Sequence, residues 1–62
     1  MPIITFDGGK ITTEQKADLV RQFTEAAHKV TGIRKEAFVI VIRENAPENI
    51  GVGGELLADR QK

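Results

Sequence analysis

The residue with the clearest chemical potential is Pro2, which directly follows the initiator Met1. If Met1 is removed, Pro2 becomes an N-terminal secondary amine held on a rigid ring. A primary α-amino group titrates near about pH 7.7 to 8.0 in a model peptide, and burial or nearby cations lower an amine's pKa further. An ordered Pro2 amine would then be neutral at working pH and could act as a base. A Met-Pro start is also common for reasons of methionine trimming, so the dipeptide alone decides nothing.

The other reactive residue types give weaker signals. The chain has no Cys and no Ser, which excludes a cysteine or serine nucleophile. Its single histidine, His28, has no set of Cys, Asp or Glu at metal-ligand spacing, so we expect neither a metal nor a cofactor. The glycine-rich run 51–54 lacks the Lys and Ser/Thr that end a phosphate loop. We interpret the scattered carboxylates, Glu44 among them, as solvated side chains, because none shows the pairing of an acid/base dyad.

The length of the chain predicts self-association. With 62 residues it forms one small domain over positions 1–62, less Met1 if that residue is trimmed. A core of this size rarely supplies more than about 3 to 5 kcal/mol of stability. Small domains are usually reinforced by disulfides, by a structural metal or by oligomerisation, and this sequence offers neither of the first two. We therefore expect a homo-oligomer.

The composition also limits the partners. Nine Lys and Arg balance nine Asp and Glu, no Trp or Tyr is present and no basic stripe is visible, which argues against nucleic acid. No apolar stretch approaches the roughly 20 residues needed to cross a bilayer, which argues against a membrane. We expect a cytoplasmic protein.

The hydrophobic pattern predicts a β-α-β unit. Residues 2–6 alternate between two faces, which is typical of a strand, and residues 7–10 have the composition of a turn. Residues 37–42 form a continuous apolar run, which predicts a strand buried on both faces. With a helix between them, the two strands should be parallel. One helix can cover only one face of a two-stranded sheet, so we expect another subunit to cover the second face.

The expected helix has clear boundaries. Thr12 or Thr13 can serve as its N-cap, and Thr12 with Gln15 fits a capping box. Residues 16–30 follow helical spacing, and Gly32 suits a left-handed C-cap. The predicted apolar stripe consists of Leu19, Val20, Phe23, Ala26, Ala27 and Val30.

The last third of the chain has a different composition. A turn is predicted at 45–49, and the glycines of 50–54 favour a tight hairpin or arm. Residues 60–62 have the composition of a frayed polar end. The predicted fold class is therefore α/β (α+β), a single β-α-β protomer with a short C-terminal hairpin.

These features together resemble the 4-oxalocrotonate tautomerase family, and more narrowly its DmpI-like subgroup. The resemblance covers essentially the whole chain. It is carried by Pro2-Ile3, by Thr13-Glu14-Gln15-Lys16, by the strand 39–42 and above all by Ile50-Gly51-Val52-Gly53-Gly54-Glu55-Leu56. The resemblance implies a cofactor-independent isomerase, usually a homohexamer built as a trimer of dimers, whose sites are completed by neighbouring chains.

Carried over by residue, the resemblance assigns Pro2 as the general acid/base. Val39 stands where family members place a substrate-binding arginine, and Ile50 stands where they place an aromatic residue. The loop arginine is replaced by either Lys10 or Ile11, and Lys10 would be a less directional carboxylate partner than an arginine. Lys10, Val39 and Ile50 are therefore the candidate substrate-binding residues. These replacements argue against the family's best-known dicarboxylate substrate.

The sequence thus predicts a tautomerase that interconverts enol or dienol and keto forms of a 2-oxo acid. Two other functions are also compatible with the sequence. Pro2 could serve a hydratase or dehalogenase reaction, or form an iminium with a carbonyl substrate. The protein could also be a non-catalytic ligand-binding oligomer that has lost the substrate-binding arginines.

Overall fold

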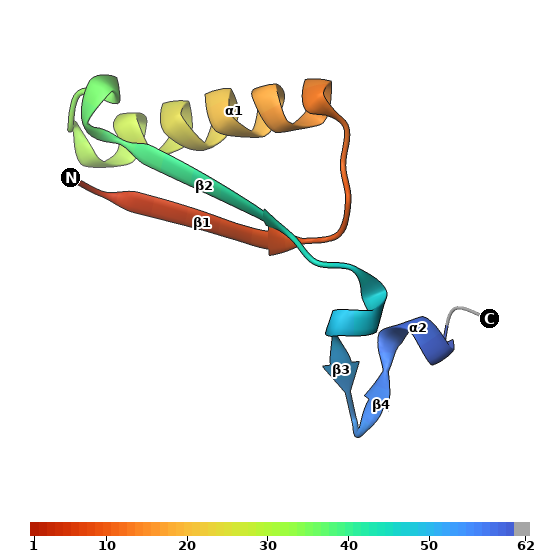
Figure 1. Ribbon diagram of the computed structural model, residues 1–62. Helices are drawn as coiled ribbons and strands as arrows, with labels where there is room; N and C mark the ends of the chain where they lie inside the picture. Colours follow the sequence, from red (N-terminus) through yellow and green to blue (C-terminus); the bar gives the residue numbers. More distant parts are fainter. Residues whose placement is uncertain (61–62) are drawn as a thin grey trace.

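Two parallel strands and one long helix form the larger part of the molecule (Figure 1). The structure is a computed structural model that describes residues 1–60. Strand β1 (Ile3–Gly8) pairs with β2 (Val39–Glu44), and helix α1 (Thr13–Thr31) lies between them in the chain. The hairpin β3 (Gly51–Val52) and β4 (Glu55–Leu56) and the short helix α2 (Leu57–Arg60) follow. The predicted α/β class, with parallel strands and a C-terminal hairpin, is confirmed.

Helix α1 begins and ends at the predicted caps. The Thr12 side chain accepts a hydrogen bond from the Gln15 backbone at 3.1 Å, and the Gln15 side chain accepts one from the Thr12 backbone at 2.9 Å. This reciprocal pair satisfies two backbone donors that the helix leaves free. At the other end Gly32 has φ 75°, a left-handed conformation that glycine adopts without steric cost.

The apolar stripe of α1 differs in part from the predicted one. Phe23 packs against Phe6 of β1, with ring centroids 6.3 Å apart. Val30 was predicted to belong to the stripe but is 85% exposed. The helix, with 19 residues, is about 28 Å long, whereas a six-residue strand spans only about 20 Å, so its last turn overhangs the sheet. The half-buried residues of the helix are Lys16, Leu19, Phe23, Thr24, Ala27 and His28.

Both strands extend further than the sequence pattern predicts. The expected turn at 7–10 is wrong for its first two residues, because Asp7 and Gly8 continue β1 by pairing with Arg43 and Glu44. Ala37 belongs to a 3-10 turn instead of the second strand. Alternation places Ile4 and Phe6 on the helix side, while Ile3, Thr5, Val39 and Val41 share the opposite face. We call this second set the open face.

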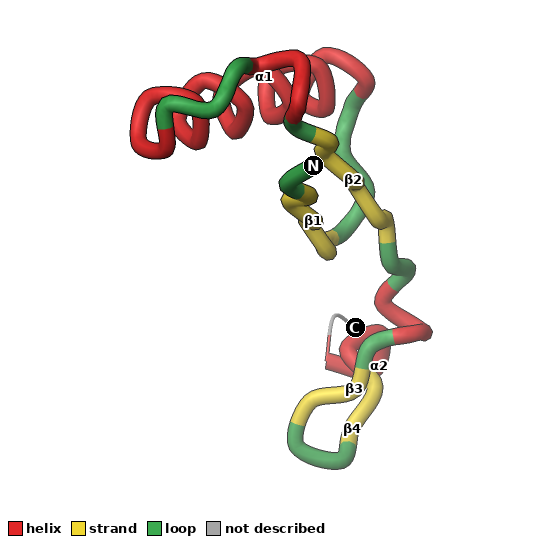
Figure 2. The backbone as a smooth tube through the Cα atoms, turned by 90° about the vertical axis from the view of Figure 1, so that its left-hand side faces the viewer, coloured by secondary structure: helices red, strands yellow, loops and turns green. Residues whose placement is uncertain are grey.

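The predicted hairpin is confirmed, and it stands apart from the β-α-β unit (Figures 1 and 2). Gly53 and Gly54 form its turn with φ 62° and 86°, as a two-residue turn between antiparallel strands requires. The Leu57 N–H donates to the Ile50 carbonyl at 2.7 Å, which closes the base of the hairpin. Arg60 was predicted to begin a frayed end but belongs to α2, and positions 61 and 62 of that prediction lie outside the described residues.

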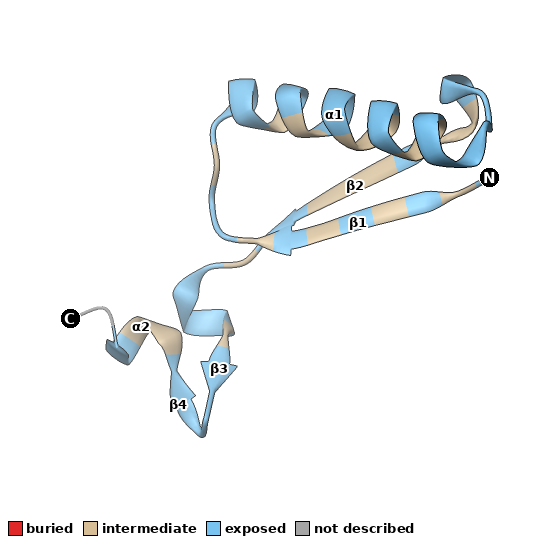
Figure 3. Cartoon of the chain, turned by 180° about the vertical axis from the view of Figure 1, so that it is seen from behind, coloured by how far each residue is buried: buried red, intermediate tan, exposed pale blue. Residues whose placement is uncertain are grey.

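The chain exposes more surface than a compact monomer of its size. None of the described residues is fully buried, and the half-buried positions lie on the sheet, on the side of α1 that faces it and on α2 (Figure 3). The radius of gyration is 15.0 Å, against about 11 Å for a compact chain of 62 residues. The accessible surface is 4863 Å², against about 4,000 Å² for a compact monomer of 6.8 kDa. No helix within residues 1–60 is long and apolar enough to span a membrane.

Candidate active site

Pro2 lies at the start of the sheet, beside Val39. Its carbonyl accepts a hydrogen bond from the Val39 N–H at 3.0 Å, which joins Pro2 to the β1–β2 ladder. Pro2 is half-buried, whereas Met1 is 89% exposed. Removal of Met1 would therefore disturb no packed side chain and would free the Pro2 nitrogen. Val39 is 37% exposed on the open face.

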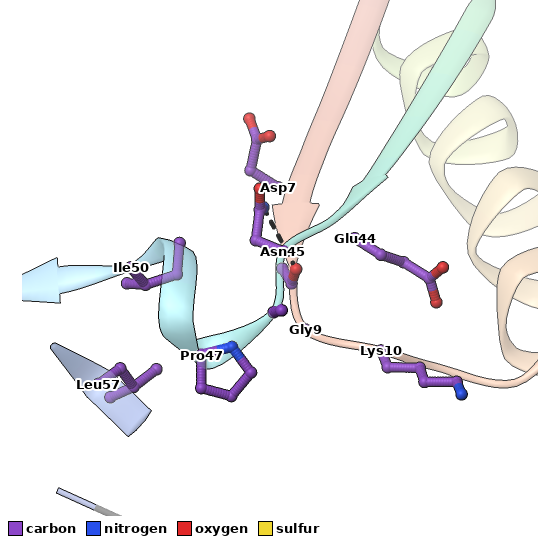
Figure 4. Close-up of a pocket in the computed structure, with 10 residues that line it drawn as sticks. Asp7, Gly9, Lys10, Glu44, Asn45, Pro47, Ile50 and Leu57 are labelled. Carbon is purple, nitrogen blue, oxygen red and sulfur yellow. Dashed lines mark hydrogen bonds between the residues drawn. The ribbon is translucent and has the colours of Figure 1, made fainter. Parts of the chain in front are cut away.

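A cavity of about 800 Å³ lies at the opposite end of the sheet, between the β-α-β unit and the hairpin. Both remaining candidates, Lys10 and Ile50, line it. Figure 4 shows two different walls. Ile50, Pro47 and Leu57 form an apolar wall on the hairpin side, while the side chains of Lys10 and Glu44 extend away from it on the other side.

One protomer therefore does not bring the four predicted site residues together. Pro2 and Val39 lie at one end of β1, and Lys10 and Ile50 lie beyond its other end. A strand of six residues spans about 17 to 20 Å, which is too far for one small substrate to contact both groups. Within one chain, these four residues therefore cannot contact the same small substrate.

Glu44 binds the loop that carries Lys10. One carboxylate oxygen accepts a hydrogen bond from the Ile11 N–H at 3.1 Å, and the other lies 3.3 Å from Lys16 Nζ. Two contacts hold the pKa of the Glu44 carboxyl below its ordinary value: the larger effect is the backbone hydrogen bond from Ile11, and the smaller is the contact with Lys16. The interpretation of Glu44 as simply solvated is therefore wrong. The sequence pattern ended the second strand at residue 42, whereas β2 continues to Glu44 and so brings this carboxylate beside the loop.

Asn45 fixes the position where the hairpin leaves the sheet. Its backbone N–H donates to the Gly8 carbonyl at 2.7 Å, and its side-chain Nδ2 donates to the same carbonyl at 3.3 Å. The two bonds tie the end of β2 to the end of β1 at the edge of the cavity. Sequence reasoning treated Asn45 only as a turn residue.

Comparison with known proteins identifies the family. Residues 2–60 match the family model described as "Tautomerase enzyme". The 2-hydroxymuconate tautomerase of Bacillus subtilis is 38% identical over 50 residues, which cover 81% of each chain. A probable tautomerase of Staphylococcus epidermidis is 43% identical over 47 residues, covering 76% of this chain and 77% of that one. The chain belongs to the 4-oxalocrotonate tautomerase family.

Solved structures agree with this assignment. A crystal structure of a homologue of 4-oxalocrotonate tautomerase matches with a TM-score of 0.89 and 36% identity, covering 94% of this chain and 97% of that chain. DmpI from Archaeoglobus fulgidus matches with a TM-score of 0.86 and 36% identity, covering 94% of this chain and all of that one. The resemblance to the family is thus confirmed, and the protein is an isomerase of the tautomerase type.

Because position 39 of this tautomerase holds a valine, we asked whether Arg43 or Arg60 lies close enough to Pro2 to replace a substrate-binding arginine. Arg43 points to the same side of β2 as Val39 but lies at the far end of the strand, and its Nη1 lies 4.0 Å from Asp7 Oδ1. Arg60 lies on α2 with its Nη2 4.0 Å from Glu55 Oε1. Neither is beside Pro2 of the same chain. The described residues contain no group of three His, Cys, Asp or Glu that could hold a metal ion.

Proposed function

We propose that this tautomerase interconverts the enol or dienol and keto forms of a 2-oxo acid, with the Pro2 amine as general acid/base. The observation that carries the proposal is that Pro2 lies at the start of the β1–β2 ladder in a chain that belongs to a tautomerase family. Its carbonyl accepts a hydrogen bond from the Val39 N–H, while its nitrogen lies outside the ladder, next to the exposed Met1. A cofactor-independent cytoplasmic enzyme is part of the same proposal.

The reaction needs one group that receives a proton and then releases it. Neutral Pro2 nitrogen takes the hydroxyl proton of the enol, and the carbonyl forms as the C=C electron pair shifts. The protonated amine then returns a proton to carbon, so that atoms and charge balance. A base with a pKa near the operating pH performs both steps best, and the secondary amine of an N-terminal proline can be brought into that range by its surroundings.

We propose that the site is completed by a second chain. The amino end of β1, with Pro2 and Val39, lacks the cation and the apolar wall that Lys10 and Ile50 offer at the other end. The outer edge of β1 has no strand beside it among the described residues. Antiparallel pairing of two such edges would place Pro2 of one chain near the Lys10 end of the other. The surface in excess of a compact monomer and the apolar open face support a homo-oligomer, which we propose is a hexamer arranged as a trimer of dimers.

The side chains proposed to bind substrate favour one carboxylate over two. Lys10 is a cation, but Val39 and Ile50 are apolar, and the cavity wall around Ile50 is apolar as well. A second carboxylate placed against these residues would lose its hydration without gaining a partner. We therefore propose a 2-oxo acid with a less polar tail as the preferred substrate, ahead of a dicarboxylate.

The test compares wild type with Pro2→Ala on phenylenolpyruvate and on 2-hydroxymuconate. Alanine also permits removal of Met1, so intact mass can establish the same N-terminus in both proteins. Alanine replaces the secondary amine of the proline ring with a less constrained primary amine, and this change should lower kcat/KM by about 100-fold. Val30→Ala, on the overhanging turn of α1, is the matched control and should retain wild-type turnover. Unchanged turnover in Pro2→Ala would overturn the proposal.

A further inference from the structure

We infer that Glu44 is a positioning residue, which holds the loop of residues 9–12 so that Lys10 can bind the carboxylate of the substrate. The inference rests on the proposed function and adds a residue to it. Glu44 would touch neither the substrate nor Pro2. It would act through the backbone of the loop.

The hydrogen bonds at the end of β2 carry this inference. Glu44 is the cross-strand partner of Gly8, the last residue of β1. One oxygen of its carboxylate accepts a hydrogen bond from the Ile11 N–H, in the loop between β1 and α1, at 3.1 Å. Its other oxygen contacts Lys16, in the first turns of the helix, at 3.3 Å. One side chain thus joins β2, the loop and α1.

The loop is open to its surroundings at Gly9 and Lys10, whereas Ile11 is half-buried. A Cβ added at Gly9 would meet no atom within 4 Å, so the chain is open to its surroundings there. Lys10 is exposed and forms no ion pair with the other described residues, whereas its neighbour Ile11 carries the bond to Glu44. The position of the Lys10 backbone therefore depends on the next peptide group along the chain.

The pairing of Glu44 also keeps Lys10 available. Glu44 is close enough to attract Lys10 electrostatically, but its two oxygens are already used by Ile11 and Lys16. Lys16 thereby neutralises the charge of the Glu44 carboxylate, a role that Lys10 would otherwise take. A substrate carboxylate could then approach Lys10 without first displacing a protein carboxylate.

The experiment compares Glu44→Ala and Glu44→Gln with wild type, using phenylenolpyruvate. Loss of a charge-assisted contact that acts on binding should raise KM about tenfold in Glu44→Ala and leave kcat within about twofold. Glu44→Gln keeps an oxygen that can accept from Ile11 and should show a smaller rise in KM, which also covers the case in which Glu44→Ala folds poorly. Glu25→Gln is the matched control, because it removes an exposed carboxylate that pairs with Arg21 on α1, far from the loop.

Two further measurements separate positioning from a general structural effect. In a Lys10→Met background, Glu44→Ala should raise KM no further, because the two changes act through one contact. Amide hydrogen exchange at Ile11 should accelerate in Glu44→Ala and stay unchanged in Glu25→Gln. An unchanged KM despite faster exchange, or an additive effect with Lys10→Met, would overturn the inference.

Failure of the proposed function gives a different result. If Pro2→Ala keeps wild-type turnover while Glu44→Ala still raises KM, the assignment of Pro2 is wrong and the role of Glu44 stands. If Pro2→Ala is inactive and Glu44→Ala has wild-type kinetics, the role of Glu44 is wrong and the proposed base stands.

Discussion

The carbonyl of Pro2 accepts a hydrogen bond from the Val39 N–H at 3.0 Å, so the two residues are neighbours across the strands. This bond orders the proline ring without using its nitrogen. It also means that any side chain at position 39 starts close to the proposed base. The apolar character of Val39 is therefore expected to influence which substrates the amine can act on.

Val39→Arg should improve the turnover of dicarboxylates. An arginine binds a carboxylate through two parallel hydrogen bonds and stays charged at any working pH. We expect kcat/KM for 2-hydroxymuconate to rise about tenfold, a change that one such contact can provide. Val39→Gln is the control for side-chain length without charge, and steady-state kinetics of both variants provide the comparison. Equal kinetics for the two variants would show that position 39 does not contact the second carboxylate.

Val41→Asp should disrupt the oligomer. Val41 lies on the open face, and a carboxylate buried there in an assembly would cost several kcal/mol without a partner. Val30→Asp introduces the same charge at a position that is already 85% exposed, and it should leave assembly intact. Sedimentation velocity measures both. An intact oligomer in Val41→Asp would mean that the open face is not an interface.

Thr12→Ala should destabilise the protein by about 1 kcal/mol, since it removes the side-chain acceptor at the N-cap of α1. Thr13 is the first residue of the helix, and Thr13→Ala should be neutral or slightly stabilising. Urea unfolding at one fixed protein concentration gives both values, because the stability of an oligomer depends on concentration. A loss of equal size in Thr13→Ala would show that the effect does not come from the N-cap hydrogen bond of Thr12.

Local sequence signals predicted the caps and the hairpin correctly. Thr12, Gln15 and Gly32 act through contacts within a few residues, and Gly53 and Gly54 have the positive φ values of a tight turn. These interactions depend little on the rest of the fold. The apolar run of the second strand likewise indicated a sheet with one face left uncovered by its own helix.

Features that depend on distant residues were not predicted. Asp7 and Gly8 have turn composition, yet they extend β1 because Arg43 and Glu44 lie beside them. The roles of Glu44 and Asn45 follow from that extension, since both bind groups more than 30 residues earlier in the chain. Val30 became exposed because helix and sheet differ in length, which no local pattern reveals. The roles of Pro2, Lys10, Val39 and Ile50 in the site stay predictions.

The most direct test of the central claim is the pH dependence of kcat/KM for a panel of enols, measured for wild type and Pro2→Ala. If Pro2 is the base, the wild-type profile has one limb near neutral pH, where the amine loses its proton. Pro2→Ala should lose most of the rate, and its residual rate should show a limb shifted toward the pH at which a primary amine titrates. The same profile and the same rate in both proteins would contradict Pro2 as the catalytic base.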